Sequence, residues 1–389
     1  MERLGDICDI LNGFAFKSDQ YIEDGIRIIR IANVQKGYIE DVAPAFYPID
    51  DNNALKYALK ESDLLISLTG NVGRVGMLEK RFLPAALNQR VACIRIKSSV
   101  ELEKSYLFHF LNSDNFEKEC ILSSKGVAQK NMSTEWLKDR EIPVPPIEEQ
   151  RKIMEVLNKV SELITKRRQQ LDKLDLLVKS KFIEMFGDMY LNSKCLPEKP
   201  LTDLADVVSG ITKGRKTKCN ELYEVPYMAV SNVKDGYIDW TTVKTIQATK
   251  QEIEQYRLMP DDILMTEGGD PDKLGRGAII RRPLENCIHQ NHIFRVRLDE
   301  RVLLPEFFEE YLKHQKAKRY FLGCAKQTTG IASINMTQLR ALPVLLPPLK
   351  LQMQFSSFVE QIDKSKANIQ QSLEKLETLK KSLMQEYFG

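Results

Sequence analysis

The sequence lacks the marks of several large protein classes. Its seven cysteines are scattered singly with no Cys-x-x-Cys pair, which argues against a disulfide framework and favours a reducing compartment. No apolar run approaches the roughly 18 residues that a membrane helix needs, and the opening MERLGDICDI has no signal-peptide pattern. Lys and Arg number 57 against 54 Asp and Glu, so any basic surface must be local. We therefore expect a soluble, cytoplasmic protein.

What the sequence does contain is an internal repeat. LGDICDILNG (4–13) matches LTDLADVVSG (201–210), and IRIANVQKGYIE (29–40) matches YMAVSNVKDGYID (227–239). SDLLIS (62–67) matches DDILMT (261–266), and Gln89 falls opposite Gln290. Small length differences inside loops explain the drift in offset between the copies. The repeat predicts two similar domains.

Each copy ends in a long amphipathic segment that follows a proline pair and stops at Phe-Gly. Gly187 follows Pro146 by 41 positions, and Gly389 follows Pro348 by the same 41, so the two segments are equal in length. Apolar residues recur at alternating steps of four and three, which predicts two helices of about 50 Å that pair as a coiled coil. The predicted seam residues are Ile153, Leu157, Val160, Ile164, Leu171, Leu174 and Val178 in the first helix, and Phe355, Phe358, Ile362, Ile369, Leu376, Leu379 and Leu383 in the second.

The remaining segments alternate β-rich runs, such as DLLISL and HIFRVRL, with a few helical patterns, such as residues 105–120 and 305–321. The predicted fold is α+β, with two mixed α/β domains, two long antiparallel helices as a spacer, and an internal pseudo-twofold repeat. The expected boundaries are residues 1–145 for the first domain, 146–187 for the central helical region, 188–347 for the second domain and 348–389 for the C-terminal helical region.

Catalytic motifs are missing. GITKGRKT (210–217) resembles a phosphate loop, but Arg215 stands where the second glycine is needed. The acids of PDDILMTEGGD (260–270) are not followed by Glu-x-Lys, and neither a methyltransferase Asp/Asn-Pro-Pro-aromatic signature nor a glycine-rich cofactor loop occurs. Cys287, His289 and His292 could approach a metal, yet the first copy offers no such ligands. We expect no catalytic residue, metal or cofactor in this chain.

The polar loops differ between the copies while the frame repeats. They place Gly beside basic and amide residues, and such side chains bind phosphates or pair with guanine and adenine edges. The alternative is that these are ordinary solvated loops. The candidate DNA contacts are Lys17, Thr69, Asn71, Arg74, Asn88, Gln89, Arg90 and Lys130 in the first copy, and Lys213, Arg215, Lys216, Lys273, Arg276, His289, Gln290, Asn291, Gln327 and Thr328 in the second.

The phrases GFAFKS, IRIANVQKGYI, DLLISLTGNVGRVG, LNQRVACIR and IPVPPIEEQRKI stand in this order in the first copy, and the second copy echoes them. In this the chain resembles, over nearly its whole length, the specificity (S, or HsdS) subunits of type I restriction–modification systems. The second copy departs from the pattern at LPVLLPPLKLQ, which lacks the Glu pair.

The resemblance implies two target recognition domains, each reading one half of a bipartite, gapped DNA site, and two helical regions that act as a ruler. It implies that the chain itself is not an enzyme. Two methyltransferase subunits using S-adenosylmethionine would dock on it for adenine methylation, and motor-nuclease subunits using ATP and Mg²⁺ would join for restriction. The competing interpretations are a stand-alone DNA-binding regulator or scaffold and, less favoured, a single-chain nuclease.

Overall fold

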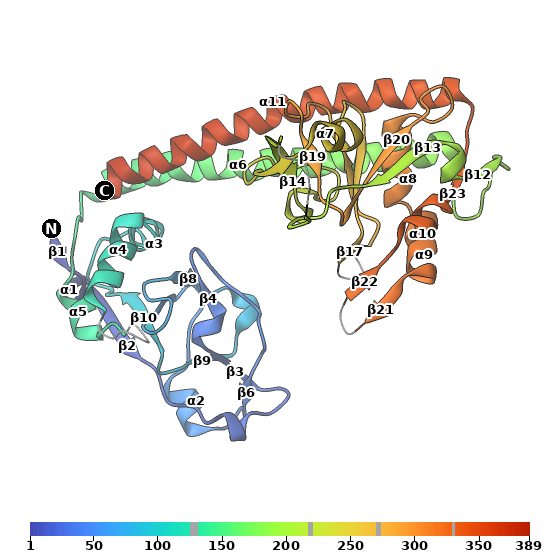
Figure 1. Ribbon diagram of the computed structural model, residues 1–389. Coiled ribbons are helices and arrows are strands. Elements are labelled where there is room, and N and C mark those ends of the chain that lie inside the picture. Colours follow the sequence, from blue (N-terminus) through green and yellow to red (C-terminus); the bar gives the residue numbers. More distant parts are fainter. Residues whose placement is uncertain (125–130, 217–220, 270–273, 329–330) are drawn as a thin grey trace. The chain divides into compact units, whose positions relative to one another are not determined.

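The computed structural model describes residues 1–124, 131–216, 221–269, 274–328 and 331–389. The chain divides into two compact units, residues 1–168 with 371–389, and residues 169–370. Each unit combines small sheets and short helices with part of two long helices, α6 (Ile147–Phe186) and α11 (Leu349–Phe388) (Figure 1). The predicted α+β class and the internal repeat are confirmed.

The first unit is built on a four-stranded antiparallel sheet of order β2 (Cys8–Asn12), β10 (Val91–Ile96), β7 (Leu64–Ser67) and β8 (Val75–Met77). A three-stranded sheet has the order β6 (Phe46–Tyr47), β3 (Ile26–Ile29) and β9 (Ala85–Leu87), with β3 and β9 parallel. Two short pairs join β1 (Glu2–Arg3) to β11 (Glu141–Ile142) and β4 (Val34–Gln35) to β5 (Tyr38–Ile39). The helices are α1 (Leu4–Ile7), α2 (Asn52–Lys56), α3 (Lys104–Leu111), α4 (Asp114–Ser123) and α5 (Thr134–Asp139).

The second unit repeats this plan. Its four-stranded sheet has the order β13 (Ala205–Ser209), β20 (Ile293–Leu298), β16 (Ile263–Thr266) and β18 (Gly277–Ile279). The three-stranded sheet has the order β15 (Lys244–Ala248), β14 (Tyr223–Met228) and β19 (Ile288–His289), again with one parallel pair. β12 (Glu198–Pro200) pairs with β23 (Pro343–Leu345). A further sheet, of order β17 (Gly268–Gly269), β22 (Ile331–Ser333) and β21 (Lys326–Thr328), has no three-stranded counterpart among the described residues of the first unit.

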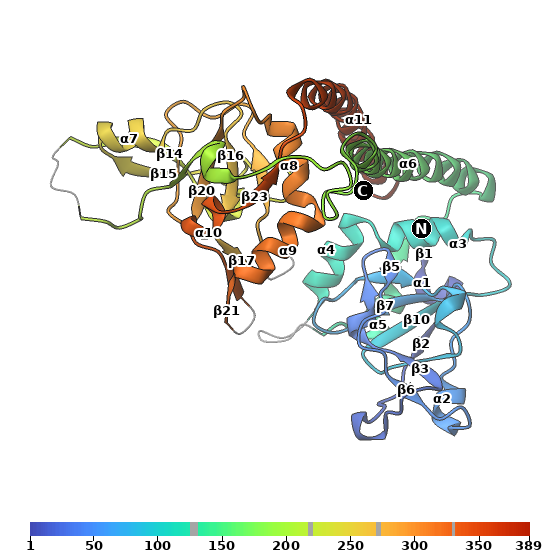
Figure 2. The same ribbon diagram turned by 90° about the vertical axis from the view of Figure 1, so that its right-hand side faces the viewer.

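The second unit's helices are α7 (Lys250–Tyr256), α8 (Pro305–Lys313), α9 (Gln315–Cys324) and α10 (Met336–Arg340). α8 packs against β18 at the edge of the sheet. α9 follows α8 directly, as Figure 2 shows. The two helical patterns predicted at residues 105–120 and 305–321 are therefore helix pairs. Ser113 caps the N-terminus of α4 and His314 that of α9, and these side-chain acceptors favour a break at each point.

Both units use the same buried polar residues to fix their loops. In the first, Asn33 accepts from the backbone N–H of Arg30 at 2.9 Å and donates to the carbonyl oxygen of Glu40 at 3.1 Å. In the second, Asn232 accepts from the N–H of Ala229 at 2.9 Å and donates to the carbonyl of Asp239 at 2.9 Å. Because a buried amide without partners would cost free energy, these bonds hold the loop in one shape.

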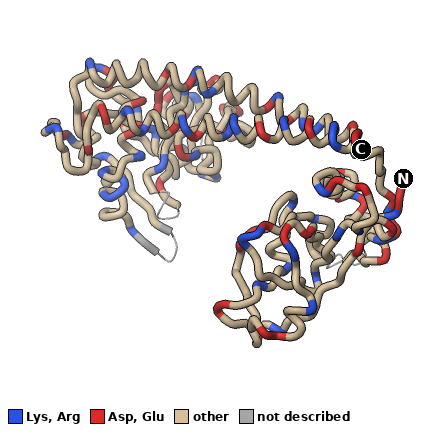
Figure 3. Tube along the Cα trace, turned by 180° about the vertical axis from the view of Figure 1, so that it is seen from behind, with Lys and Arg blue, Asp and Glu red and all other residues tan. Residues whose placement is uncertain are grey.

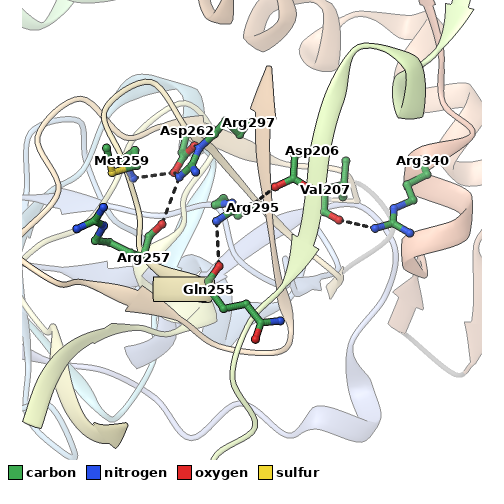
Figure 4. A network of polar contacts seen from close by, with 9 residues as sticks. All are labelled: Asp206, Val207, Gln255, Arg257, Met259, Asp262, Arg295, Arg297 and Arg340. Carbon is green, nitrogen blue, oxygen red and sulfur yellow. Dashed lines mark hydrogen bonds and ion pairs between the residues drawn. The ribbon is translucent and has the colours of Figure 1, made fainter. Parts of the chain in front are cut away.

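A bidentate ion pair is repeated as well. Arg95 holds Asp63 through two hydrogen bonds of 2.7 and 2.6 Å. Arg297 holds Asp262 through bonds of 2.7 and 2.8 Å, as Figure 4 shows. The second unit adds Arg295, which is buried and bonds the carboxylate of Asp206 and the carbonyl oxygen of Gln255 on either side (Figure 4). Paired charges of this kind tie the strand ends to the preceding turns.

The two long helices run antiparallel. Within the first unit Arg168 pairs with Glu377 at 2.7 Å, and within the second Asp175 pairs with Lys366 at 2.6 Å, so partner numbers fall as numbers rise. Each helix has 40 residues and is therefore about 60 Å long. Figure 3 shows both signs of charge interspersed along them.

All seven predicted seam residues of α6 are buried or half-buried, as pairing of the helices requires. The predicted seam of α11 is wrong at Leu379, which is 46% exposed, and Phe358 lies only half-buried beside the contact line. The buried or half-buried positions instead keep steps of four and three through Phe355, Val359, Ile362, Lys366, Ile369, Leu373, Leu376, Lys380 and Leu383. Two lysines thus occupy seam positions, where their apolar stems can pack while the ammonium reaches outward.

Each long helix is fastened to a unit at both of its ends. At the start of α6, buried Gln150 accepts from the N–H of Glu103 at 2.9 Å and donates to the carbonyl of Pro145 at 2.8 Å. At the start of α11, Gln352 makes the same two bonds with Leu304 and Pro347, each at 2.9 Å.

In each repeated Phe-Gly ending, the phenylalanine side chain packs into the hydrophobic core of a unit. Phe388, at the end of α11, packs edge-on against Tyr106 of the first unit, with ring centroids 5.3 Å apart. Phe186, at the end of α6, packs against Phe307 of the second unit at 4.8 Å and against Phe355 at 5.5 Å. Each unit therefore contains the start of one long helix and the end of the other.

Candidate nucleic-acid interface

In the first unit, three loops converge on one hollow. They are the β7–β8 loop, the β9–β10 loop and the 3₁₀ turn Ile31–Asn33 with the strand after it. The hollow has a volume of about 290 Å³ and is lined mainly by small and polar residues. The lining residues are Ile31, Ala32, Gln35, Thr69, Gly70, Asn71, Arg74 and Arg90. Four of the predicted contacts, Thr69, Asn71, Arg74 and Arg90, are thus brought together.

The β7–β8 loop is held rigidly by its own hydrogen bonds. The backbone N–H groups of Ser67 and Gly73 donate to the carbonyls of Arg74 and Ser67, each at 3.0 Å, and the Ser67 hydroxyl accepts from the N–H of Arg74 at 3.0 Å. Gly73 has φ +85°, and a Cβ there would lie 2.7 Å from Cβ of Cys120. The glycine is therefore required both by the backbone and by the packing of α4.

The side chain of Arg74 is positioned by a residue that the sequence analysis did not single out as a contact. Its guanidinium donates to Gln35 Oε1 at 2.6 Å, and Gln35 Nε2 donates to the carbonyl oxygen of Ala32 at 3.0 Å. Gln35 lies inside the phrase IANVQKGY, which aligns the copies and contributes to the family resemblance but did not mark Gln35 as a site residue. No pattern in the sequence indicates that Gln35 contacts Arg74, which lies 39 positions later.

The β9–β10 loop presents two predicted residues and buries a third. Gln89 and Arg90 are exposed, and the N–H of Gln89 is fixed by the carbonyl oxygen of Phe14 at 2.9 Å. Asn88 is only 8% exposed, and its side-chain oxygen accepts from the N–H of Arg90 at 3.3 Å. Asn88 therefore shapes the loop, and its prediction as a surface contact is wrong. Lys17 is exposed but does not line the hollow.

The hydrogen bonds of the second unit shift the alignment of this loop by one residue. Gln290 N donates to the carbonyl of Met228 as Asn88 N does to that of Ile29, and the bridge from Ile211 to Gln290 repeats that from Phe14 to Asn88. Gln290 therefore corresponds to Asn88, and the predicted match with Gln89 is wrong. Asn291 and His292 take the places of Gln89 and Arg90.

His289 is fully buried, and its Nδ1 lies 3.0 Å from the carbonyl oxygen of Ile293. Burial lowers the pKa of this imidazole to about 4, so it is neutral at pH 7. A buried, neutral ring cannot contact DNA, and its prediction as a contact is wrong. His292 is exposed instead, and its Nδ1 lies 2.5 Å from Glu267 Oε2, an acidic neighbour that the sequence analysis missed.

Arg215 is engaged within the fold. It forms a bidentate ion pair with Glu252 and also donates to the carbonyl oxygen of Gln247 at 3.2 Å. The hydrogen bond from Arg215 is the main cause that lowers the pKa of Glu252 to about 2. Arg215 therefore fixes the loop, while its neighbours Lys213 and Lys216 are exposed.

The other predicted contacts of the second unit are placed as follows. Arg276 is half-buried and lines a separate hollow of about 300 Å³ with Glu309 and Lys313. Gln290 is half-buried, and its side-chain oxygen accepts from the N–H of Val230 at 3.4 Å. Lys130 and Lys273 lie outside the described residues, and Gln327 and Thr328 are strand residues of β21 whose side chains are not described.

The described ranges contain neither a metal-binding cluster nor a membrane-spanning helix. No group of three or more His, Cys, Asp and Glu side chains there could hold a metal ion. No helix in those ranges has the length and apolar character needed to cross a membrane.

Comparison with known proteins decides the family. The family described as "Type I restriction modification DNA specificity domain" matches this chain twice, over residues 1–174 and 197–378. This chain belongs to that family. It is a specificity subunit with two such domains, as the resemblance of its repeated phrases predicted.

The chain is 22% identical over 407 residues to the type I restriction enzyme EcoKI specificity subunit of Escherichia coli K12, spanning 98% of this chain and 86% of that one. It is 24% identical, with the same coverage, to the StySPI specificity subunit of Salmonella potsdam. Two solved structures share the fold. One is the type I restriction–modification S subunit from M. genitalium, with TM-score 0.55, 15% identity, and coverage of 100% of this chain and 95% of that one. The other comes from work on complex assembly in a type I system, with TM-score 0.58, 16% identity, and coverage of 100% and 96%.

Proposed function

We propose that each domain of this specificity subunit reads one half of a bipartite, gapped DNA site. The observation that carries the proposal is that the two domains share the same scaffold but differ in the residues at their loop tips. The frame is the same twice, down to Asn33 and Asn232 and the Asp–Arg pairs. At the tips, Arg90 of one copy is replaced by His292 in the other. Two similar scaffolds with different tips suit the reading of two different short sequences.

The proposed contacts are the described predicted residues that keep an exposed or half-exposed polar group at the loop tips. Arg and Lys side chains suit guanine edges and phosphates, and amides suit adenine. The set comprises Asn71, Arg74, Gln89 and Arg90 in the first unit, and Lys213, Lys216 and Asn291, joined by His292, in the second; Thr69 is left out because its hydroxyl is buried.

The helix pair is proposed to act as the spacer. We assign target recognition to residues 1–145 and 188–347, and spacing to residues 146–187 and 348–389. Half-sites on one face of DNA lie about 34–36 Å apart per helical turn. A rod of about 60 Å can therefore set a separation of one turn or more.

Catalysis is proposed to belong to partner subunits. Two methyltransferase subunits would supply S-adenosylmethionine and methylate adenine, a base that must leave the stack to react. Motor-nuclease subunits would use ATP and Mg²⁺ for restriction. The assembly would work in the cytoplasm, where its DNA is.

A line of exposed apolar residues on α6 is the proposed dock for the methyltransferase. Val156 and Leu163 lie seven residues apart within the first unit, so they form one stripe beside the α11 contact line, and both are exposed. A partner helix laid along this stripe would bury it. Leu163→Lys should abolish co-purification of the methyltransferase subunit. Leu122→Lys, at an 84% exposed position on α4, is the matched control and should leave it intact.

The purified chain with S-adenosylmethionine, ATP and Mg²⁺ should be inert, and should support methylation once its methyltransferase partner is added. Sequencing of methylated bases should then reveal two short sequences separated by a fixed gap. Turnover by the chain alone would favour a single-chain enzyme. Sequence-specific binding without any methyltransferase partner would favour a regulator or scaffold.

A further inference from the structure

The Gln35–Arg74 contact in the first unit has an arrangement that fixes the direction of a guanidinium. Both polar atoms of the Gln35 side-chain amide form hydrogen bonds. Oε1 accepts from Nη1 of Arg74 at 2.6 Å, and Nε2 donates to the carbonyl oxygen of Ala32 at 3.0 Å. Because the amide must keep its oxygen toward Arg74 and its nitrogen toward Ala32, it cannot turn without losing a bond.

The supports on both sides of this contact are themselves rigid. Ala32 belongs to the 3₁₀ turn whose shape is fixed by buried Asn33. The backbone of Arg74 is clamped by Ser67, through the N–H of Arg74 to the Ser67 hydroxyl and the N–H of Ser67 to the carbonyl of Arg74, both at 3.0 Å. Gln35 therefore joins two fixed loops across the hollow.

Most of the guanidinium is left available. Arg74 has five N–H donors in a planar fork, and Gln35 takes one of them. In the part of the chain that the structure describes, no other hydrogen bond engages this side chain. A forked edge held over a hollow lined by Asn71 and Arg90 matches the paired acceptors O6 and N7 of guanine.

The second unit does not repeat the contact. The bridge between Val34 and Ile39 is matched by that between Val233 and Ile238, which places Lys234 where the first unit has Gln35. A lysine ammonium carries only donors, so it cannot accept from Arg276 as Gln35 does from Arg74. The matched arginines are thus held differently in the two units.

We propose that Gln35 is a positioning residue that holds Arg74 for a bidentate contact with a guanine in the half-site read by the first domain. The proposal rests on the proposed function of that domain. Holding the fork in advance reduces the rotamer entropy lost on binding, so the preference for guanine depends on Gln35 as well as on Arg74.

The test uses the full chain with its methyltransferase partner and a duplex library randomised in both half-sites. Methylation rates are read for each base at each position. Arg74→Ala should lower the preference for guanine at one position by about 5- to 150-fold, the range of a lost bidentate pair. Gln35→Ala should weaken the preference at that same position, by a smaller factor.

Two further variants separate positioning from folding. Gln35→Glu keeps the acceptor for Arg74 but loses the donor to Ala32, so it should keep more of the guanine preference than Gln35→Ala does, while the added negative charge weakens binding to all sequences alike. Lys234→Ala, the matched change in the second unit, should leave the first half-site unchanged. If Gln35→Ala does not fold, Gln35→Lys takes its place: it puts the second unit's residue at this position and removes the acceptor for Arg74, so it should weaken the guanine preference, and an unchanged preference would overturn the proposal.

A uniform loss at every position in Gln35→Ala, or an unchanged guanine preference in Arg74→Ala, would overturn the proposal. Failure of the wider function would look different, because the unaltered chain would then show no pair of half-sites at all. A bipartite site that none of these variants alters contradicts the role of Gln35 alone.

Discussion

Replacing Phe388 by alanine should loosen the first unit while leaving the second intact. The side chain is 4% exposed and lies 5.3 Å from the ring of Tyr106 and 6.1 Å from that of Phe110. It is the point at which the end of α11 enters the core of that unit. Phe186 has the same role for α6 in the second unit.

The magnitude follows from burial and position. Truncating a fully buried phenylalanine to alanine costs about 3–5 kcal/mol, with ring–ring contacts included. Because Phe388 ends its helix, the loss is limited to the free energy of detaching the last turn, so we expect about 3 kcal/mol. Leu379→Ala on the same helix removes a side chain that is 46% exposed and should cost about 0.5 kcal/mol or less.

The chain offers a separate probe for each unit, since its two tryptophans, Trp136 and Trp240, lie one in each. Urea unfolding of single-tryptophan variants, made by changing one or the other to phenylalanine, should show Phe388→Ala lowering the Trp136 midpoint and sparing that of Trp240. Phe186→Ala should do the reverse. An equal fall of both midpoints, or an effect no larger than that of Leu379→Ala, would refute the idea that each helix end closes one unit.

Three further predictions concern pH, spacing and symmetry. Arg215 holds the pKa of Glu252 at about 2, below its ordinary 4.5, so the ion pair stabilises the fold fully above pH 4.5 and loses this effect as the pH falls toward 2. The difference in unfolding free energy between the unaltered chain and Arg215→Ala, measured by urea unfolding, should therefore shrink below pH 4, and a difference that widens there would contradict the assignment. Inserting seven residues after Val160 lengthens α6 by about 10 Å in phase with the seam, so methylated sites should keep both half-sequences but change or lose the gap between them. An unchanged gap with full activity would show that the helices do not set the spacing. The fragment 1–187 lacks the end of α11, and in a dimer the α6 end of each copy can replace it in the other. Sedimentation should show this dimer, and sequencing of methylated DNA should show an interrupted palindrome; a stable monomer would contradict the prediction.

Much of the fold could be predicted because the repeat and the helical periodicity are local properties of the sequence. The predicted seam residues of α6 are all buried or half-buried because they are Leu, Ile and Val, whose periodicity the sequence displays directly. Two of the seven predicted positions of α11, Phe358 and Leu379, lie beside the observed line, whereas Lys366 and Lys380 occupy positions in it. An apolar pattern cannot show that a lysine stem fills a seam position and that its ammonium pairs with Asp175.

The candidate site was predicted less completely because its contacts join distant residues. The identity of Gln89 and Gln290 suggested an alignment that the strand bridges move by one residue. Burial of Asn88 and His289 depends on the parallel pairing of β9 and β19 with strands some 60 residues earlier, which no local pattern reveals. Gln35 escaped notice for the same reason, since its partner Arg74 lies 39 residues later, in the loop between β7 and β8.

The most direct test of the central claim is sequencing of methylated bases in DNA from cells that carry this chain with its methyltransferase partner, with and without Arg74→Ala. The account predicts two short sequences at a fixed gap, and a change confined to one of them in the variant. A single uninterrupted site, or an equal change in both halves, would contradict the assignment of one half-site to each domain.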